Sequence, residues 1–440
     1  MNNYTRRILP ALLLLLTAFS ISHSQTPPSS DDRSNARTML STIRNDLQNH
    51  YYDPQFGGMN LEERFKTAEQ KIDQATSLAQ LLGVVGQVLL DLNDSHTFFI
   101  PPGRTYKTDY GWQMKAIGDR CYVVAVNPQS DAEAKGLQQG DEIVSIDGMK
   151  PTRDNEWKIL YLYYQIRPRP GMRLTVIKPN GEERQLDVAA KIQTGKKVVN
   201  LSVYGQGYDT ADLIREEEKD AHLNRQRYVE LGDAFIWKMP GFDQDPVEVR
   251  DTIEKVKKHK TLILDLRGNG GGYEQTLLAL IGNVFDHEVK LGQLKRRKEQ
   301  KDLIAKSRGD EAFAGKIVVL IDSQSASAAE LFARVVQLEK RGTVIGDRSA
   351  GAVMRSQVYS HTIGIDRFIP YAASITDADI IMTDGKSLEH QGVVPDELKL
   401  PSASDLAAKR DPVLAYALSL AGTEITPEKA GTLFPVEWKK

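Results

Sequence analysis

A serine-rich segment, Ser325-Ala-Ser-Ala-Ala-Glu330, holds the residues of this sequence that are best suited to nucleophilic chemistry. It follows an apolar run at 316–321 that predicts a buried strand, and it precedes a run with the apolar spacing of a helix. Ser327 would then lie at the helix N-terminus, where unpaired amides and the positive end of the helix dipole favour an oxyanion. Ser327 is therefore a candidate nucleophile, and the backbone amide of Ala328 is a candidate oxyanion donor.

The alternative is that a serine at this place simply caps the helix. Ser323, Ser325 and Ser327 all precede the helical run, and serine is a preferred N-cap residue. Judged on this segment alone, capping is the better-supported interpretation. A nucleophilic role for Ser327 therefore needs support from partners elsewhere in the chain.

A glycine run, Arg267-Gly-Asn-Gly-Gly-Gly272, lies between another predicted buried strand and a helix. Glycines let the backbone turn sharply and bring its amides close to a ligand. Two interpretations compete. An amide near Gly270 or Gly271 could be a second oxyanion donor, or the run could bind a nucleotide phosphate. The run does not fit the G-x-G-x-x-G spacing of dinucleotide sites, which weakens the second interpretation.

A nucleophilic serine needs a base, and three histidines are candidates. His96 lies in Asp94-Ser-His-Thr97 at the end of an apolar helical run, and its rivals are His361 and His390. Glu389, which directly precedes His390, is a carboxylate that could orient a histidine and stabilise its cationic form. Taken alone, a lone histidine is more often structural and a lone glutamate is more often a surface acid.

No metal or other cofactor is expected. The sequence has no H-E-x-x-H pattern and no other compact set of His, Asp and Glu at ligand spacing. Its single cysteine, Cys121, lies in an apolar strand-like run and is predicted to be a buried apolar residue rather than a nucleophile. One cysteine also excludes an internal disulfide.

Three patterns along the chain would position these residues. Residues 34–92 place apolar side chains at helical spacing, whereas residues 106–192 change to short strands with turns, including a hairpin around Pro179-Asn-Gly181. From about residue 229, buried-type strands alternate with helices, which predicts an α/β layered core. Between them, a charge run at 215–219 indicates a solvated segment without an assigned function.

The whole chain has the composition of an ordinary folded protein. Its 440 residues suggest two or three domains, and a formal charge of −2 gives no reason to expect a nucleic-acid partner. Residues 1–24 combine a basic start, an apolar stretch and small residues, which predicts a signal peptide and export to the periplasm or the exterior. The alternative is an uncleaved anchor, but the apolar stretch is short and contains Pro10, so no stable membrane span is expected.

Together these segments resemble the C-terminal processing and tricorn-type serine peptidases of the S41 family. The matching motifs occur in the family's order at 91–97, 264–272, 318–330, 345–351 and 389–396. The resemblance implies an α/β fold with a crotonase-like catalytic core, a helical N-terminal region and an inserted PDZ domain. The implied divisions are a signal peptide at 1–24, a helical region at 25–104, a PDZ-like domain at 105–195 and a catalytic domain at 196–440.

The resemblance also implies a polypeptide partner. In the PDZ-like segment, the residues that match the expected carboxylate-binding loop are Gly111, Trp112, Gln113 and Met114. PDZ domains bind peptides by strand addition at a sheet edge, so a peptide or unfolded protein could be held there through its C-terminus. The alternative is a domain that only packs on the catalytic core.

One departure from the family pattern selects the base. The processing-protease branch uses a Ser–Lys dyad, but Ala352 stands where the lysine is expected, and no lysine occurs between Lys340 and Lys386. The tricorn-type branch uses serine, histidine and glutamate, with a further serine beside the histidine. The residues of those types at matching places are Ser327, His96, Glu389 and Ser95. These two independent observations reverse the preference for a purely capping serine.

The resulting prediction is a serine-type peptidase that forms an acyl-enzyme on Ser327. His96 would take the serine proton, Glu389 would orient and stabilise the imidazolium, and the amides of Ala328 and Gly271 would stabilise the oxyanion. Two alternatives stay open, since a fold does not fix a function. One is a non-catalytic peptide- or ligand-binding protein on the same fold, and the other is an acyl-CoA-type crotonase-like enzyme.

Overall fold

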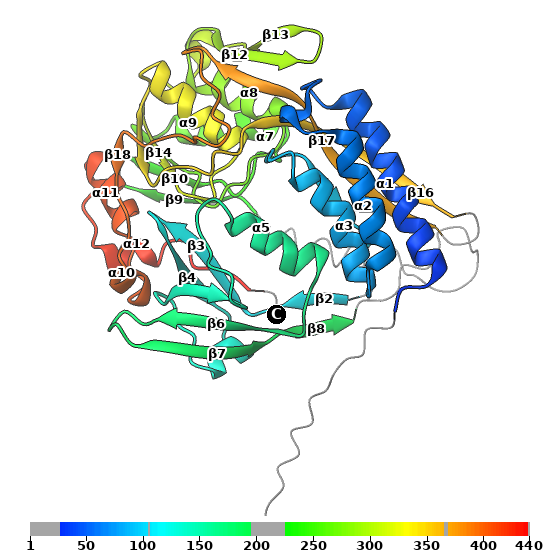
Figure 1. Cartoon of the computed structure of the whole chain (residues 1–440). Helices are drawn as coiled ribbons and strands as arrows, with labels where there is room; N and C mark the ends of the chain where they lie inside the picture. The colour runs from blue at the N-terminus through cyan, green and yellow to red at the C-terminus, as the bar shows by residue number, and fades with distance from the viewer. Residues whose placement is uncertain (1–26, 104–105, 195–224, 365–367, 439–440) are drawn as a thin grey trace, which may run out of the picture.

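The computed structural model describes residues 27–103, 106–194, 225–364 and 368–438. The predicted signal peptide at 1–24 and the charge run at 215–219 lie outside these described residues. Within the described ranges, no helix combines the length and the apolar character that crossing a membrane requires. Figure 1 shows the arrangement of the chain, with the helical region, the middle segment and the C-terminal half as three neighbouring parts.

A six-stranded sheet forms the core of the C-terminal half. In spatial order its strands are β18 (Glu397–Leu398), β15 (Thr343–Gly346), β14 (Lys316–Ile321), β11 (Thr261–Asp265), β10 (Ala234–Lys238) and β9 (Arg227–Leu231). All neighbouring strands run parallel except β9 and β10. The buried strand predicted at 316–321 and the one predicted before the glycine run are confirmed as β14 and β11, and so is the alternation of strands with helices.

Helices cover both faces of this sheet, which explains why its central strands are uninterrupted apolar runs. On β14, Val319 and its alternate neighbours pack in a cluster with α7 (Pro246–Val256), α8 (Glu274–Val284) and α9 (Ala328–Leu338). Leu320 points to the opposite face, where it packs with α11 (Pro412–Leu420) and α12 (Pro427–Gly431). The predicted α/β layered core is therefore confirmed.

A second, antiparallel sheet contains the longest strands of the structure. A ribbon of β16 (Met354–Ile363) and β17 (Ile369–Met382) is joined by β1 (Phe98–Ile100), β12 (Val289–Arg296) and β13 (Gln300–Ala305). The sequence analysis did not predict β17, whose Pro370, Asp377 and Asp379 are poor strand formers. Pairing with β16 along one edge and with β1 and β12 along the other edge stabilises it regardless.

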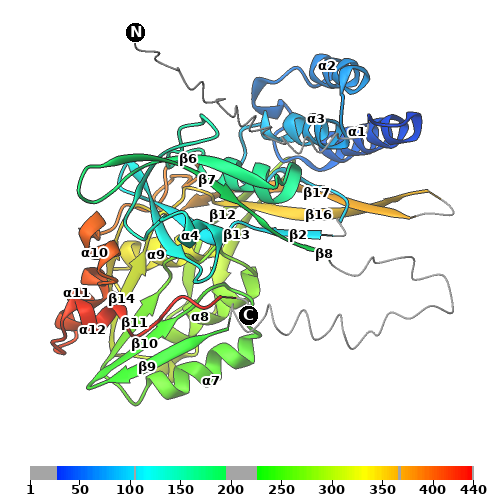
Figure 2. The same cartoon turned by 90° about the horizontal axis from the view of Figure 1, so that it is seen from below.

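Three helices confirm the helical prediction for residues 34–92: α1 (Ser30–His50), α2 (Leu61–Gln74) and α3 (Leu78–Leu90). Their apolar faces form one cluster that also includes Tyr371, Ala373 and Ile375 of β17. Figure 2 shows this bundle lying against the β16–β17 ribbon. The polar segment with His96 follows α3 and precedes β1, so it is held between the bundle and the second sheet.

Residues 106–194, called the insert below, form a mostly antiparallel β structure. Its main sheet has the order β3 (Trp112–Ile117), β4 (Arg120–Val126), β5 (Glu142–Ile146), β6 (Gly171–Ile177) and β7 (Glu183–Ala189). Strands β2 (Tyr106–Asp109) and β8 (Lys191–Thr194) pair where the chain enters and leaves it. The insert also contains α4 (Asp131–Ala134), α5 (Glu156–Tyr161) and a π-helical turn, η2 (Leu162–Ile166).

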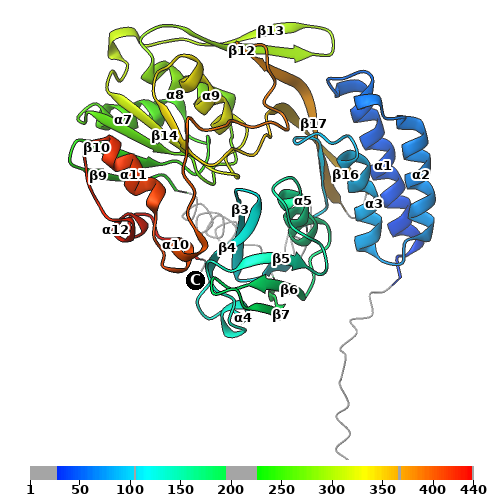
Figure 3. The ribbon, with the colours of Figure 1, turned by 60° about the vertical axis from the view of Figure 1, so that its left-hand side comes forward.

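Two predictions for the insert are confirmed. Strands β6 and β7 form the hairpin around Pro179-Asn-Gly181. Cys121 is a buried free thiol in β4, and burial raises its pKa to about 12, so it stays protonated at neutral pH. Strand β3 lies at the edge of the sheet, and Figure 3 shows it as the strand of the insert that lies nearest the core.

Truncation of Leu320 should destabilise the core. Leu320 is fully buried in β14, so Leu320→Ala leaves a cavity between the sheet and α11, and it should lower the free energy of unfolding by about 2–5 kcal/mol. Equilibrium unfolding in urea measures the change. The matched control is Val358→Ala, whose side chain is 59% exposed and should cost about 0.5 kcal/mol or less. Equal losses in the two variants would contradict the core assigned here.

Candidate active site

Ser327 differs from the other serines of its segment in both backbone and side chain. It occupies the N-cap of α9 with φ 54° and ψ −118°, a strained conformation for a residue with a side chain. Although the segment has the outline of a capping box, the Ser327 side chain makes no N-cap hydrogen bond. By contrast, Ser325 Oγ donates to Leu266 O at 2.8 Å and Ser323 Oγ donates to Ala116 O at 2.5 Å. Ser327 is thus the serine of this segment whose hydroxyl is not tied to the backbone.

The glycine run lies directly against Ser327. Gly271 has φ 95°, and a Cβ atom placed on it would come within 2.6 Å of Ser327 Cβ, so no side chain fits there. Its amide, however, donates to Asn269 Oδ1 at 2.8 Å. In this structure Gly271 therefore packs closely against Ser327. Its amide was expected to be a free oxyanion donor, but it is already hydrogen-bonded to Asn269. The Ala328 amide makes no hydrogen bond to any described residue.

A chain of hydrogen bonds joins Glu389, Ser95 and His96. Ser95 Oγ donates to Glu389 Oε2 at 2.8 Å and lies 2.8 Å from His96 Nδ1. Glu389 Oε1 also accepts from the Ser95 amide at 2.9 Å. Because Ser95 Oγ donates its proton to Glu389, it can only accept a hydrogen bond from His96. The imidazole proton of His96 is therefore assigned to Nδ1, which leaves Nε2 as the basic nitrogen. The three residues predicted to act together are therefore brought together.

Asp94 shapes the loop that presents His96. The Asp94 carboxylate is buried, and its Oδ1 accepts from the amides of His96 and Thr97 at 2.9 and 3.1 Å and from Thr376 Oγ1 at 2.7 Å. Tyr51 donates to its Oδ2 at 3.1 Å. Burial lowers the pKa of His96, while the charge of Asp94 raises it in part. The sequence showed Asp94 only as part of a polar cluster, since Tyr51 and Thr376 are distant in the chain.

A short segment, residues 349–353, connects the serine to the histidine. Ala352 O accepts from the Ser327 amide at 2.8 Å, and the amide of the next residue, Val353, donates to Glu389 Oε2 at 2.8 Å. Ala352, which stands where the family's lysine is expected, thus contacts the serine through its backbone. Two consecutive residues of this segment therefore hold the Ser327 backbone and the Glu389 carboxylate.

Glu330 holds the same segment from the other side, and the sequence analysis gave it no role. Its fully buried carboxylate accepts from Ser349 Oγ at 2.5 Å and from the amides of Gly351, Ala352 and Ser327 at 2.8, 2.9 and 3.1 Å. Burial raises the pKa of Glu330 to about 7, and these hydrogen bonds oppose the rise. In the sequence, a glutamate at the third position of a helix is typical of a capping box. Its contacts with residues 349–352 therefore could not be predicted from the sequence.

The two rival histidines are engaged elsewhere. His361 Nε2 lies 2.7 Å from Asp46 Oδ2, between β16 and α1. His390 is about half exposed, and its Nε2 lies 2.8 Å from Asn93 O. Neither forms a hydrogen bond with Ser327 among the described residues. The structure also shows no hydrogen bond between Ser327 Oγ and His96, so the step that joins them remains a prediction.

The residues expected to form a carboxylate-binding loop lie at the start of β3. The Gly111 amide donates to Asp109 Oδ1 at 2.8 Å, and Gly111 O accepts from the Asn127 amide. Trp112, Gln113 and Met114 belong to β3, and Met114 O accepts from Gln324 Nε2 at 3.2 Å. The peptide-binding role of this loop stays a prediction.

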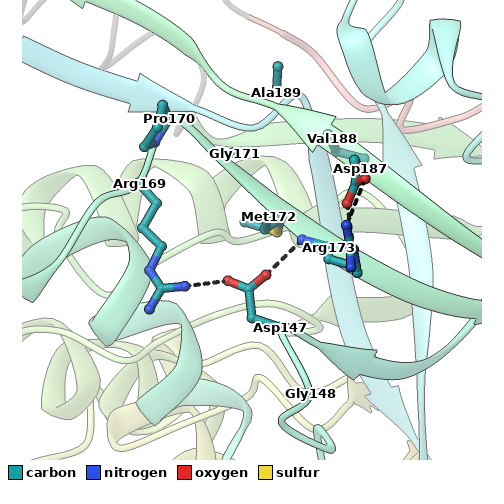
Figure 4. A pocket seen from close by; sticks show the side chains of 10 residues that line it. All are labelled: Asp147, Gly148, Arg169, Pro170, Gly171, Met172, Arg173, Asp187, Val188 and Ala189. Carbon is teal, nitrogen blue, oxygen red and sulfur yellow. Dashed lines mark hydrogen bonds and ion pairs between the residues drawn. The ribbon is translucent and has the colours of Figure 1, made fainter. Parts of the chain in front are cut away.

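A large cavity of about 760 Å³ lies in the insert, remote from these residues. Figure 4 shows that its charged side chains pair with one another: Asp147 with Arg169, and Arg173 with Asp187. Because these charges are already neutralised, the cavity offers no convergent polar groups for catalysis. Across the described ranges, no group of three or more His, Cys, Asp and Glu side chains is placed to hold a metal ion.

A serine at a strained helix start, linked through residues 352–353 to a partly buried histidine–carboxylate chain, resembles the arrangement of the serine hydrolases. Residues 236–398 match the model of peptidase family S41, so this part of the chain is of the S41 serine-peptidase type. The matched segment contains Ser327, Gly271, Glu330 and Glu389. His96 and Ser95 lie outside it and are joined to it only by the fold.

Two curated relatives are carboxy-terminal or tail-specific proteases. The chain is 23% identical over 379 residues to the tail-specific protease of Haemophilus influenzae, an alignment covering 81% of this chain and 51% of that protein. It is 21% identical over 300 residues to the carboxy-terminal processing protease CtpA of Bacillus subtilis, covering 66% of this chain and 57% of that protein. The chain thus spans about half the length of these relatives.

Solved structures support the fold. A structure of mature CPAF complexed with lactacystin matches with a TM-score of 0.62 at 17% identity, covering 89% of this chain and 98% of that chain. The photosystem II D1 C-terminal processing protease matches with a TM-score of 0.53 at 18% identity, covering 91% and 99% of the two chains. At these identities the likeness establishes a shared mixed α/β fold.

The pKa of His96 should lie below 6.5 and should respond to Asp94. Because burial lowers it and the Asp94 charge raises it, Asp94→Asn should lower the pKa of His96 further. Titration of the His96 ring signals by NMR measures both values. Asp119→Asn, at an exposed position of the insert, is the matched control and should leave the His96 pKa unchanged. A His96 pKa at or above 6.5 in the unsubstituted protein would contradict the environment described here.

Proposed function

We propose that this protein is a serine peptidase that hydrolyses peptide bonds through an acyl-enzyme on Ser327. The observation that carries the proposal is the freedom of the Ser327 hydroxyl at a strained helix start, which residues 352–353 link to the partly buried chain of Glu389, Ser95 and His96. The match to peptidase family S41 supports the same reaction class. The tail-specific and carboxy-terminal processing activities in the names of its relatives make a polypeptide the substrate class that we propose.

The first chemical step is the attack of Ser327 Oγ on the carbonyl carbon of a peptide bond. His96 Nε2 accepts the serine proton as the C–O bond forms, and it then donates this proton to the leaving amine as the C–N bond breaks. Water next attacks the ester, with its proton passing to His96, and the proton returns to Ser327 as the acid product leaves. Each half reaction starts and ends with a neutral imidazole.

Glu389 and Ser95 stabilise the cationic form of His96 in both halves. Glu389 reaches the ring only through Ser95 Oγ, so its negative charge acts across one hydroxyl. Burial raises the pKa of Glu389, and the hydrogen bonds that it accepts from Ser95 and Val353 oppose this rise. Since burial lowers the pKa of His96, the base stays neutral to a lower pH than an exposed imidazole would, and activity falls only below that lowered pKa.

The oxyanion that forms on the substrate is proposed to lie at the start of α9. The Ala328 amide is placed at the positive end of the helix dipole and has no acceptor among the described residues. The Gly271 amide would have to exchange Asn269 Oδ1 for the oxyanion before it could contribute. We therefore assign the main role to Ala328 and a conditional one to Gly271.

The finer features of the fold belong to the same proposal. We propose a crotonase-like catalytic domain at 196–440, a PDZ-like insert at 105–195 and a helical region at 25–104, preceded by a signal peptide at 1–24 that directs export. The parallel sheet with helices on both faces supports the first assignment. A five-stranded antiparallel sheet with α5 and η2 beside its edge strand supports the second.

Replacement of the nucleophile should abolish hydrolysis without unfolding the protein. Ser327→Ala should reduce peptide turnover by about 10⁴-fold or more, because the acyl-enzyme can no longer form. A fluorophosphonate probe should label Ser327 in the unsubstituted protein and should fail to label the variant. The matched control is Ser404→Ala, which removes an exposed hydroxyl and keeps the nucleophile. Labelling of Ser327→Ala at the original rate would remove Ser327 from the role.

Loss of the Glu389 carboxylate should slow the reaction while leaving the nucleophile in place. Glu389 accepts three hydrogen bonds and donates none, so the amide group of Glu389→Gln must point a donor at another donor. We expect kcat to fall by about 10²-fold or more, with a smaller change in KM. Steady-state kinetics on a peptide substrate measures both, and Glu288→Gln, at an exposed position, is the control. An unchanged kcat would exclude Glu389 from stabilising the cationic form of His96.

A further inference from the structure

The outer edge of strand β3 is already occupied by residues of the nucleophile loop, here defined as residues 322–327. Met114 O accepts from Gln324 Nε2 at 3.2 Å, and Ala116 O accepts from Ser323 Oγ at 2.5 Å. Between them, the Ala116 amide donates to Glu156 Oε2 at 2.9 Å. Strand addition by a peptide needs these same backbone groups. A peptide that paired with this part of β3 would therefore have to displace Ser323 and Gln324.

Two charged side chains of the insert strengthen this contact. Lys115 Nζ lies 2.5 Å from Asp322 Oδ2, and the Asp322 side chain is only 9% exposed. Glu156 is buried at the start of α5, and its Oε1 accepts from Gln324 Nε2 at 2.8 Å while its Oε2 accepts from β3. Glu156 therefore bridges the edge strand and the nucleophile loop. Removal of one partner from so buried a pair leaves the other unsatisfied.

The same contact extends to the groups next to Ser327. Asp322 Oδ1 accepts from the Gly268 amide at 2.9 Å and from the Gln324 amide at 3.0 Å. Gly268 begins the glycine turn that ends at Gly271, which lies against Ser327. Asn269 O, in the same turn, accepts from the Ala326 amide at 2.9 Å. The ion pair of Lys115 thus holds both the nucleophile loop and the glycine turn in one position. Figure 3 shows β3 and α5 at the side of the insert that faces the core.

We propose that Lys115 and Glu156 are positioning residues for the reaction, and that the β3 edge docks the nucleophile loop instead of presenting an open site for a peptide. The proposal rests on the peptidase function of Ser327. It follows from two β3 carbonyls that residues 323 and 324 occupy, one partly buried ion pair to Asp322, and the Glu156 carboxylate, which joins the Ala116 amide to Gln324. The insert then contributes to the rate of the reaction itself, even for substrates too short to reach it.

The test compares Lys115→Ala and Glu156→Ala with the unsubstituted full-length protein. The substrate is a chromogenic tetrapeptide, and a second readout is the rate at which a fluorophosphonate labels Ser327. Because a displacement of about 1 Å in a reacting group can cost about 10²-fold, we expect both kcat and the labelling rate to fall about 10- to 100-fold, with KM changed little. Lys115→Arg keeps the charge and should recover most of the rate.

Matched controls separate positioning from a general loss of stability. Arg173→Ala breaks an ion pair with Asp187 at the exposed cavity of Figure 4 and should leave both rates unchanged. If either alanine variant fails to fold, Gln324→Ala replaces it, since this change removes the links to Met114 and Glu156 without leaving a buried charge unpaired. Alanine variants that keep the original labelling rate, with weakened binding only of long peptides, would overturn the proposal.

Hydrogen exchange keeps this test separate from the proposed peptidase function. Amide exchange of the nucleophile loop, measured by mass spectrometry, should become faster in Lys115→Ala and should stay unchanged in Arg173→Ala, whether or not the protein hydrolyses peptides. If the unsubstituted protein shows neither labelling nor turnover, the proposed function fails. If exchange in the loop is the same in both variants, the docking proposal fails.

Discussion

The candidate site depends on two carboxylates, one buried and one partly buried, that hold one short stretch of backbone between them. Glu330 accepts hydrogen bonds from the amides of Gly351 and Ala352, and Glu389 accepts one from the amide of Val353. Carboxylates that are largely removed from water require such donors, and the successive amides of residues 351–353 supply them. The stretch in turn holds the Ser327 amide through Ala352 O. The positions of the serine and of the histidine relay are thus set by one shared element.

This arrangement explains how the site can do without the lysine of the processing-protease branch. Ala352 provides no side chain at the expected place, and its backbone serves as the link between Ser327 and Glu330. In the proposed mechanism the base comes instead from the loop between α3 and β1, where Asp94 fixes the turn and Ser95 connects His96 to Glu389. The helical bundle and the second sheet therefore complete the site, and they are more than a support for the parallel core.

The parts of the fold that could be predicted are those whose local pattern and final environment agree. Strand β14 is a continuous apolar run because both of its faces are buried, and α9 follows it with a clear apolar face. Strand β17 could not be predicted, because Pro370 and two aspartates oppose strand formation and only its pairing partners overcome them. Propensity describes a residue in isolation, whereas sheet pairing depends on strands far away in the chain.

The sequence by itself determined the chemical types of the site: a serine before a helix, a glycine turn, a Ser–His pair and a glutamate, with no lysine available. Only the tertiary structure decided their use. It connected Ser95 to Glu389 across 294 residues, engaged the Gly271 amide, gave Glu330 its four donors and placed the β3 edge on the nucleophile loop. The physical reason is that a buried polar group must find its partner in space, and the fold, not the local sequence, brings that partner near.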